Sequence, residues 1–123
     1  MGQKEKRKHP RISISVAVSC IILDMDGAPL NNYMAIVTGV SQKGVAIDIL
    51  GEIDASEVQL SFFAINNDNL EIKAKVVHLH CFKPGMMKAG LLLVGRPQEV
   101  SDFVRQLVRF SHFTKTLSSS VHA

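Results

Sequence analysis

Two arginines near the N-terminus are the residues best suited to bind an anionic ligand that also contains a flat ring. Arg7 and Arg11 form an R-x-x-x-R pair directly ahead of the first apolar segment. The ring of Pro10 biases His9 away from helix, so we expect an extended or turning segment between the arginines. A guanidinium can hold phosphate oxygens through paired donors and can stack on a purine. The pair could therefore hold a nucleotide from two sides.

A second polar segment, with the sequence GVSQKG, occupies residues 39–44. Ser41 contributes a hydroxyl that can both donate and accept a hydrogen bond. Gly44 permits either a positive φ or the close approach of another backbone. Taken alone, the segment also has the composition of a plain hairpin connection, so its chemistry depends on what surrounds it.

The elements around these segments are predicted by a period of two that begins directly after Arg11. Residues 12–22 alternate between apolar and mostly small polar side chains, which is typical of a half-buried strand. Similar segments, separated by Gly, Pro and Asn turn signals, predict strands at residues 33–38, 45–50, 58–65, 70–82 and 89–94. Within residues 70–82 the apolar phase slips after Val76, which predicts a bulge.

After Pro97 the apolar residues change to a helical period. The predicted fold is therefore all-β: a six-stranded antiparallel barrel followed by one C-terminal helix that covers an open end or flank. We divide the chain into a flexible basic arm at residues 1–11, the barrel with its helix at residues 12–113, and a frayed tail at residues 114–123. The helical stripe consists of Val100, Phe103, Val104, Leu107 and Val108.

The two polar segments, one before the first predicted strand and one between the second and third, resemble the motifs of the PilZ family in type and order. In that family an R-x-x-x-R arm precedes the first strand of a six-stranded barrel, and a D/N-x-S-x-x-G turn joins the second and third strands. The resemblance extends from Arg7 to about Phe113. It implies a receptor for the bacterial second messenger cyclic di-GMP. By this resemblance Arg7 and Arg11 clamp the phosphates and stack on guanine, while Ser41 and Gly44 belong to the turn that reaches the base edge.

One position departs from the family pattern. Gly39 stands where the family usually has Asp or Asn, so the side chain that would accept a hydrogen bond from guanine is missing. The loss of a hydrogen bond to a charged group costs about 1.5–3 kcal/mol. This energy corresponds to roughly ten- to hundredfold weaker binding. The alternative is therefore a degenerate PilZ-like module that binds only proteins and not cyclic di-GMP.

The net charge of +3 is concentrated at the N-terminus, where residues 1–11 contain five basic residues and one acidic residue. A basic arm on a nearly neutral body favours an anionic partner. We expect the ligand to order the arm against the barrel, and the new surface to signal to an unidentified effector protein. No apolar stretch approaches the roughly 20 residues of a membrane span. No convincing signal peptide is present, so we expect a cytoplasmic protein.

Other functions find less support in the sequence. No nucleophile–base arrangement is visible, so we expect no enzyme activity and no cofactor. His78 and His80 share a strand face beside Cys81, but no further metal ligand is near in the pattern. A nucleic-acid partner is disfavoured, because the chain has one Tyr and no Trp to stack on bases. The pattern is compatible with a monomer or a homodimer.

Overall fold

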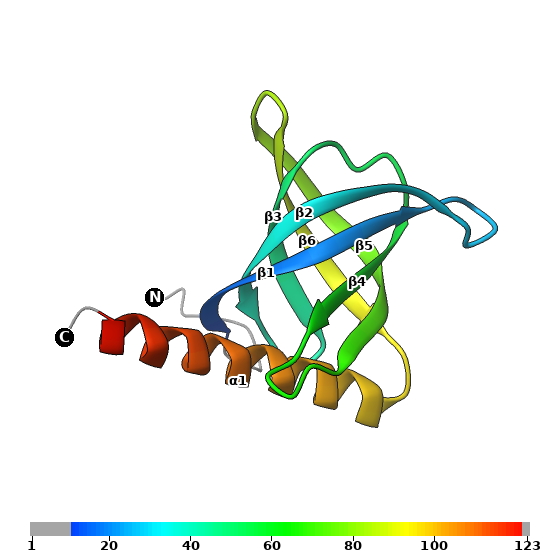
Figure 1. Ribbon diagram of the computed structural model, residues 1–123. Helices are drawn as coiled ribbons and strands as arrows, with labels where there is room; N and C mark the ends of the chain where they lie inside the picture. Colours follow the sequence, from blue (N-terminus) through cyan, green and yellow to red (C-terminus); the bar gives the residue numbers. More distant parts are fainter. Residues whose placement is uncertain (1–10, 122–123) are drawn as a thin grey trace, which may run out of the picture.

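Six antiparallel strands close into a barrel in the order β1-β2-β3-β6-β5-β4, and one helix follows them (Figure 1). The computed structural model describes residues 11–121, and the side chains of residues 116–121 are outside the description. The predicted barrel with a C-terminal helix is confirmed. The elements are β1 (Ile12–Leu23), β2 (Pro29–Val40), β3 (Gly44–Leu50), β4 (Glu57–Phe63), β5 (Asn69–Lys83), β6 (Met86–Val94) and α1 (Pro97–Val121).

The barrel interior is filled by the apolar side of each strand's alternating pattern. In β1 the side chains of Ile14, Val16 and Val18 are buried, whereas Ser15 and Ala17 between them are exposed. Every strand contributes inward side chains to one core, because successive side chains of a strand point to opposite faces. Burial raises the pKa of the Cys20 thiol to about 12, so this thiol remains neutral within the core.

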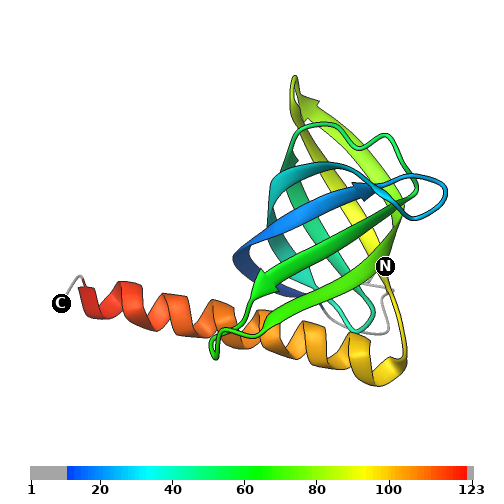
Figure 2. The same ribbon diagram turned by 45° about the vertical axis from the view of Figure 1, so that its right-hand side comes forward.

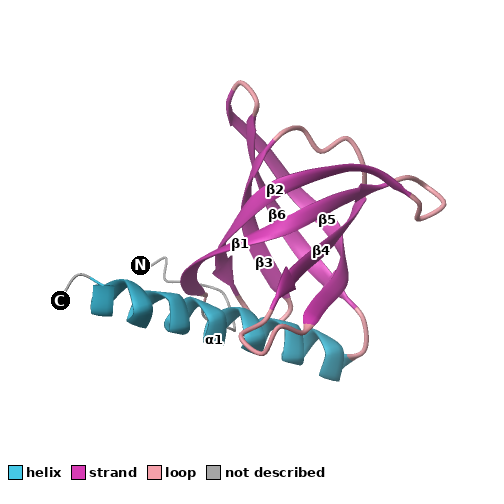
Figure 3. Ribbon diagram, viewed as in Figure 1, coloured by secondary structure: helices cyan, strands magenta, loops and turns pink. Residues whose placement is uncertain are grey.

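Helix α1 lies across one end of the barrel (Figures 1 and 3). Phe103 and Leu107 are buried against the core. The Phe62 ring meets those of Phe103 and Phe110 edge to face at centroid distances of 5.4 and 5.9 Å. At the helix start, the Arg96 N–H donates to the Glu99 carboxylate at 2.9 Å. This hydrogen bond lowers the pKa of Glu99 below its usual value.

The helix is longer than the sequence predicted. It continues to Val121, past the boundary at Phe113 where we expected a frayed tail. No Gly or Pro follows Pro97, so nothing in the sequence stops the helix. Its C-terminal part extends beyond the barrel (Figure 2). None of the described residues forms a helix with the length and apolar character that crossing a bilayer requires.

Strand β2 is also longer than predicted, at both ends. Asn31 and Asn32 were expected in a loop, but they pair with Ile22 and Ile21 of β1. Long cross-strand pairing overrides the local turn preference of asparagine here. At the other end β2 continues through Val40, so part of the segment expected to be a turn is strand. In β5 the register shifts between Val76 and His78, which confirms the predicted bulge.

Candidate functional site

The connection between β2 and β3 is a tight turn of Ser41, Gln42 and Lys43 that is fastened to two neighbouring strands. The Ser41 N–H donates to the Gly44 carbonyl at 2.9 Å, and the Ser41 hydroxyl approaches the same carbonyl at 3.4 Å. The Lys43 carbonyl accepts a hydrogen bond from the Leu93 N–H at 2.9 Å. The turn is therefore held in one position relative to β6. The Ser41 oxygen keeps lone pairs that can accept a hydrogen bond from a ligand.

Gly44 is required by the close approach of another backbone rather than by a positive φ. A Cβ atom at this position would lie 2.7 Å from the Leu91 carbonyl oxygen of β6. Such a contact cannot form without a shift of one strand. The sequence left open whether Gly44 serves a positive φ or a close approach of backbones, and the structure favours the close approach.

Gly39 lies within β2, paired with Ser13 of β1 and Ala46 of β3. Its φ is not in the positive region. A Cβ atom there would meet the Ile12 carbonyl oxygen at 3.7 Å and the Ala46 Cβ at 4.0 Å, which are ordinary contacts. The position therefore tolerates a side chain, and the local backbone does not demand glycine.

Strand register creates a hollow on the outer face of the barrel beside this turn. Gly39 pairs with Ala46, Ala46 pairs with Gly90, and Gly90 pairs with His78 of the bulged strand β5. Three neighbouring strands thus contribute no side chain larger than a methyl group to one lateral row. The resulting ligand hollow has a volume of about 260 Å³. It is lined by Arg11, Gly39, Val40, Ser41, Lys43, Gly44, Val45, Ala46, Val77, Gly90, Leu91 and Leu92.

Four of the five residues that the sequence singled out line this one hollow: Arg11, Gly39, Ser41 and Gly44. The fifth, Arg7, lies outside the described residues. Arg11 comes directly before β1, and the pairing of Ile12 with Val40 brings the start of β1 beside the end of β2. The chain segments on the two sides of the hollow are therefore adjacent although about 30 residues separate them in sequence.

Lys43, Gly90 and Val77 are among the lining residues of the hollow that sequence reasoning did not single out. Lys43 was part of the quoted segment, and its exposed ammonium adds a second cation to the rim. Gly90 and Val77 come from β6 and β5, and only the strand register reveals their place. Among the lining residues the charged side chains are those of Arg11 and Lys43, so the hollow favours an anionic ligand.

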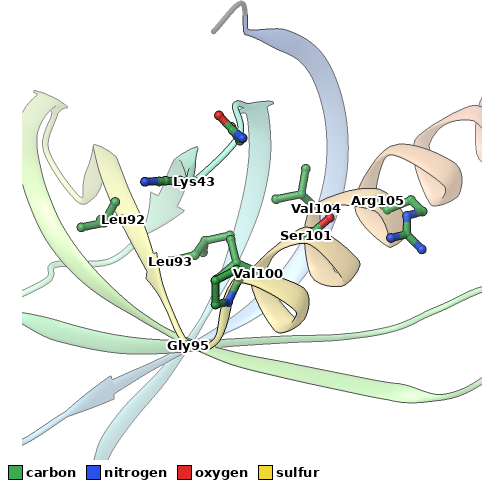
Figure 4. Close-up of a pocket in the computed structure, with 10 residues that line it drawn as sticks. Lys43, Leu92, Leu93, Gly95, Val100, Ser101, Val104 and Arg105 are labelled. Atoms are coloured by element: carbon green, nitrogen blue, oxygen red, sulfur yellow. The ribbon is translucent and has the colours of Figure 1, made fainter. Parts of the chain in front are cut away.

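A larger groove lies on the other side of the same turn, between β6 and helix α1 (Figure 4). This helix groove has a volume of about 560 Å³. Lys43 and Leu92 line both the groove and the ligand hollow. The groove is lined by Gln42, Lys43, Leu92, Leu93, Gly95, Pro97, Val100, Ser101, Val104 and Arg105.

Among the described residues, the histidines of β5 do not belong to a cluster of metal-ligating side chains. Across residues 11–121, no three His, Cys, Asp or Glu side chains gather as a group that could hold a metal ion. His78, His80 and Cys81 are instead exposed on the barrel surface.

The sequence was also compared with known proteins. No protein-family model matches the chain, and no curated protein matches it. Membership of the PilZ family thus stays a prediction that rests on the two polar segments and the barrel.

Proposed function

We propose that the chain is a receptor for cyclic di-GMP and binds it at the ligand hollow. The observation that carries the proposal is the gathering of Arg11, Gly39, Ser41 and Gly44 around one cavity with a cationic rim. These residues come from segments that are distant in the sequence. Their meeting at one place supports a common binding role better than two unrelated surface features would.

The geometry suggests how each part of the ligand would be held. Neighbouring strands are about 4.8 Å apart, so the row from Gly39 through Ala46 to Gly90 spans roughly 10 Å. A strip of this width with no bulky side chain accepts a purine lying flat on the barrel. Arg11 would grip a phosphate, and Arg7 would join it from the arm. Ser41 would hydrogen-bond the base edge.

We further propose that the protein binds and signals rather than catalyses. Ligand binding would order the basic arm at residues 1–11 against the barrel, and an effector protein would recognise the new surface. A receptor for a bacterial second messenger would act in the cytoplasm, which agrees with our reading of the sequence.

Isothermal titration calorimetry with cyclic di-GMP tests the proposal, with Arg11→Ala as the decisive variant. We expect saturable heat from the wild type and none from Arg11→Ala. Two charge-assisted hydrogen bonds at about 1.5–3 kcal/mol each amount to a loss of a hundredfold or more. Arg109→Ala is the matched control, because Arg109 is an exposed arginine on α1 outside the hollow. Normal binding by Arg11→Ala would show that the site is elsewhere.

The second candidate function is a protein-interaction module that has lost the nucleotide. The observation that favours it is the missing acceptor at Gly39. This candidate predicts no heat with cyclic di-GMP for either the wild type or Gly39→Asp. The same titration series therefore separates the two functions.

A further inference from the structure

The hairpin tip, residues 24–28 between β1 and β2, presents a methionine between two aspartates. The Met25 side chain is fully exposed, with a relative accessibility of 102%. The Asp24 carboxylate accepts hydrogen bonds from the N–H groups of Asp26 and Ala28, both at 2.8 Å. Gly27 closes the turn with φ 83° and donates its N–H to the Asp24 carbonyl. The tip is thus a preorganised turn rather than a loose loop.

These features suit the tip for docking. An unbranched thioether side chain adapts to irregular apolar surfaces. The Asp26 carboxylate makes no hydrogen bond or ion pair with the described residues and remains available to a cation. A preorganised turn also loses little conformational entropy when it docks.

The helix groove has the complementary chemistry. Leu92, Leu93, Val100 and Val104 supply apolar side chains, and none of the ten lining residues is acidic. Figure 4 shows Lys43 on one side of the groove and Ser101, Val104 and Arg105 on the helix at the other side. Within residues 11–121 Lys43 has no ion-pair partner. Arg105 forms an ion pair with Asp102, in which one guanidinium nitrogen lies 3.0 Å from a carboxylate oxygen. An apolar anchor flanked by carboxylates therefore fits this groove.

We propose that the helix groove binds the hairpin tip of a second copy of this chain. The tip cannot reach the groove of its own chain. The β2–β3 turn that lines the groove lies at the Ile12 end of β1, and the tip follows Leu23 at the other end (Figure 1). The path along the 12 residues of β1 is about 40 Å. The proposal does not depend on cyclic di-GMP binding.

The N-terminal segment is a poorer occupant on grounds of charge. Residues 1–10 carry Lys4, Lys6, Arg7 and Lys8, which have the same sign as the groove rim, and Met1 is their only large apolar residue. Like charges disfavour this contact. The acidic tip of another copy instead brings opposite charges together.

The expected association is head-to-tail and weak. Each copy offers one tip and one groove, so successive copies build an open chain or close into a ring. A five-residue turn covers far less surface than the roughly 1,600 Å² of a stable interface. We therefore expect a dissociation constant on the order of hundreds of micromolar.

Methyl NMR of the full chain labelled at its methionines tests the contact. Between about 20 µM and about 1 mM, spanning the expected dissociation constant, we expect the Met25 methyl signal to shift. The Met34 methyl is the matched control, because it is 63% exposed on β2 and lies outside the groove. Ser101→Glu places a carboxylate in the groove without removing a core side chain, so it should abolish the shift.

A mixing experiment identifies the two partners. For this experiment Met25→Ala is labelled at its leucine and valine methyls, because the groove is lined by Leu92 and Val104 and by no methionine. This variant retains the groove, so unlabelled wild type should shift its groove signals, whereas unlabelled Met25→Ala should not. A Met25 signal that does not change with concentration would overturn the proposal. Shifts of equal size from unlabelled Met25→Ala, or association that survives Ser101→Glu in a folded variant, would overturn it as well.

Discussion

Replacing Gly39 by aspartate tests the proposed ligand site most directly, because the structure predicts both its benefit and its small cost. Gly39 has an extended backbone in β2, and an added Cβ would make only ordinary contacts, the nearest at 3.7 Å to the Ile12 carbonyl oxygen. The penalty for a side chain at positive φ, about 1–2 kcal/mol, therefore does not apply. We expect the variant to fold with nearly unchanged thermal stability.

The expected gain in affinity follows from one hydrogen bond. An aspartate at this position would face the hollow and accept from the N–H groups of guanine, which contributes about 1.5–3 kcal/mol. This energy corresponds to roughly ten- to hundredfold tighter binding of cyclic di-GMP. The cations of Arg11 and Lys43 on the rim would favour the carboxylate, although they would also be partly diverted from the ligand phosphates.

Calorimetric titration of Gly39→Asp and Gly39→Ala separates the hydrogen bond from the added Cβ. Both variants introduce the same Cβ, but only aspartate adds an acceptor. We expect Gly39→Ala to bind like the wild type and Gly39→Asp to bind more tightly. Equal affinities in two folded variants would refute the argument that this row of the barrel faces a guanine. The module without nucleotide binding would then be the better description.

Two further predictions concern stability and reactivity. Gly44→Ala should destabilise the fold by about 1–3 kcal/mol in chemical denaturation, because the added Cβ would press on the Leu91 carbonyl oxygen. Gly39→Ala is the matched control. Equal stabilities of the two variants would contradict the close approach of β6 to Gly44. Alkylation by iodoacetamide near pH 8 should modify the exposed Cys81 quickly and Cys20 only on unfolding, because burial raises the Cys20 pKa to about 12 and leaves almost no thiolate. Rapid labelling of both thiols in the folded protein would contradict the buried position of Cys20.

The sequence by itself determined the elements whose signals are local. The period of two from Ile12 onward predicted β1 and its buried face, because alternation along a strand is also alternation between core and solvent. The phase slip after Val76 predicted the bulge of β5 for the same reason. The helical period after Pro97 predicted α1, although the end of the helix at Val121 was missed, since no residue marks a stop.

The site was predictable only in part. Arg11 and Ser41 stood out by residue type and by the resemblance to the PilZ family. Gly39 and Gly44 stood out by their places in the segment at residues 39–44. Gly90 and Val77 carried no signal that could have linked them to the site. Gly39 was expected in a turn, but it pairs within β2.

The tertiary structure decided what lies beside what. The row from Gly39 through Ala46 to Gly90 exists only because three strands pair in one register, and a shift by one residue would place different side chains there. The helix groove likewise depends on how α1 packs across the end of the barrel. Local patterns specify which side of a strand is buried, whereas register and helix placement are selected by packing between segments that are distant in sequence.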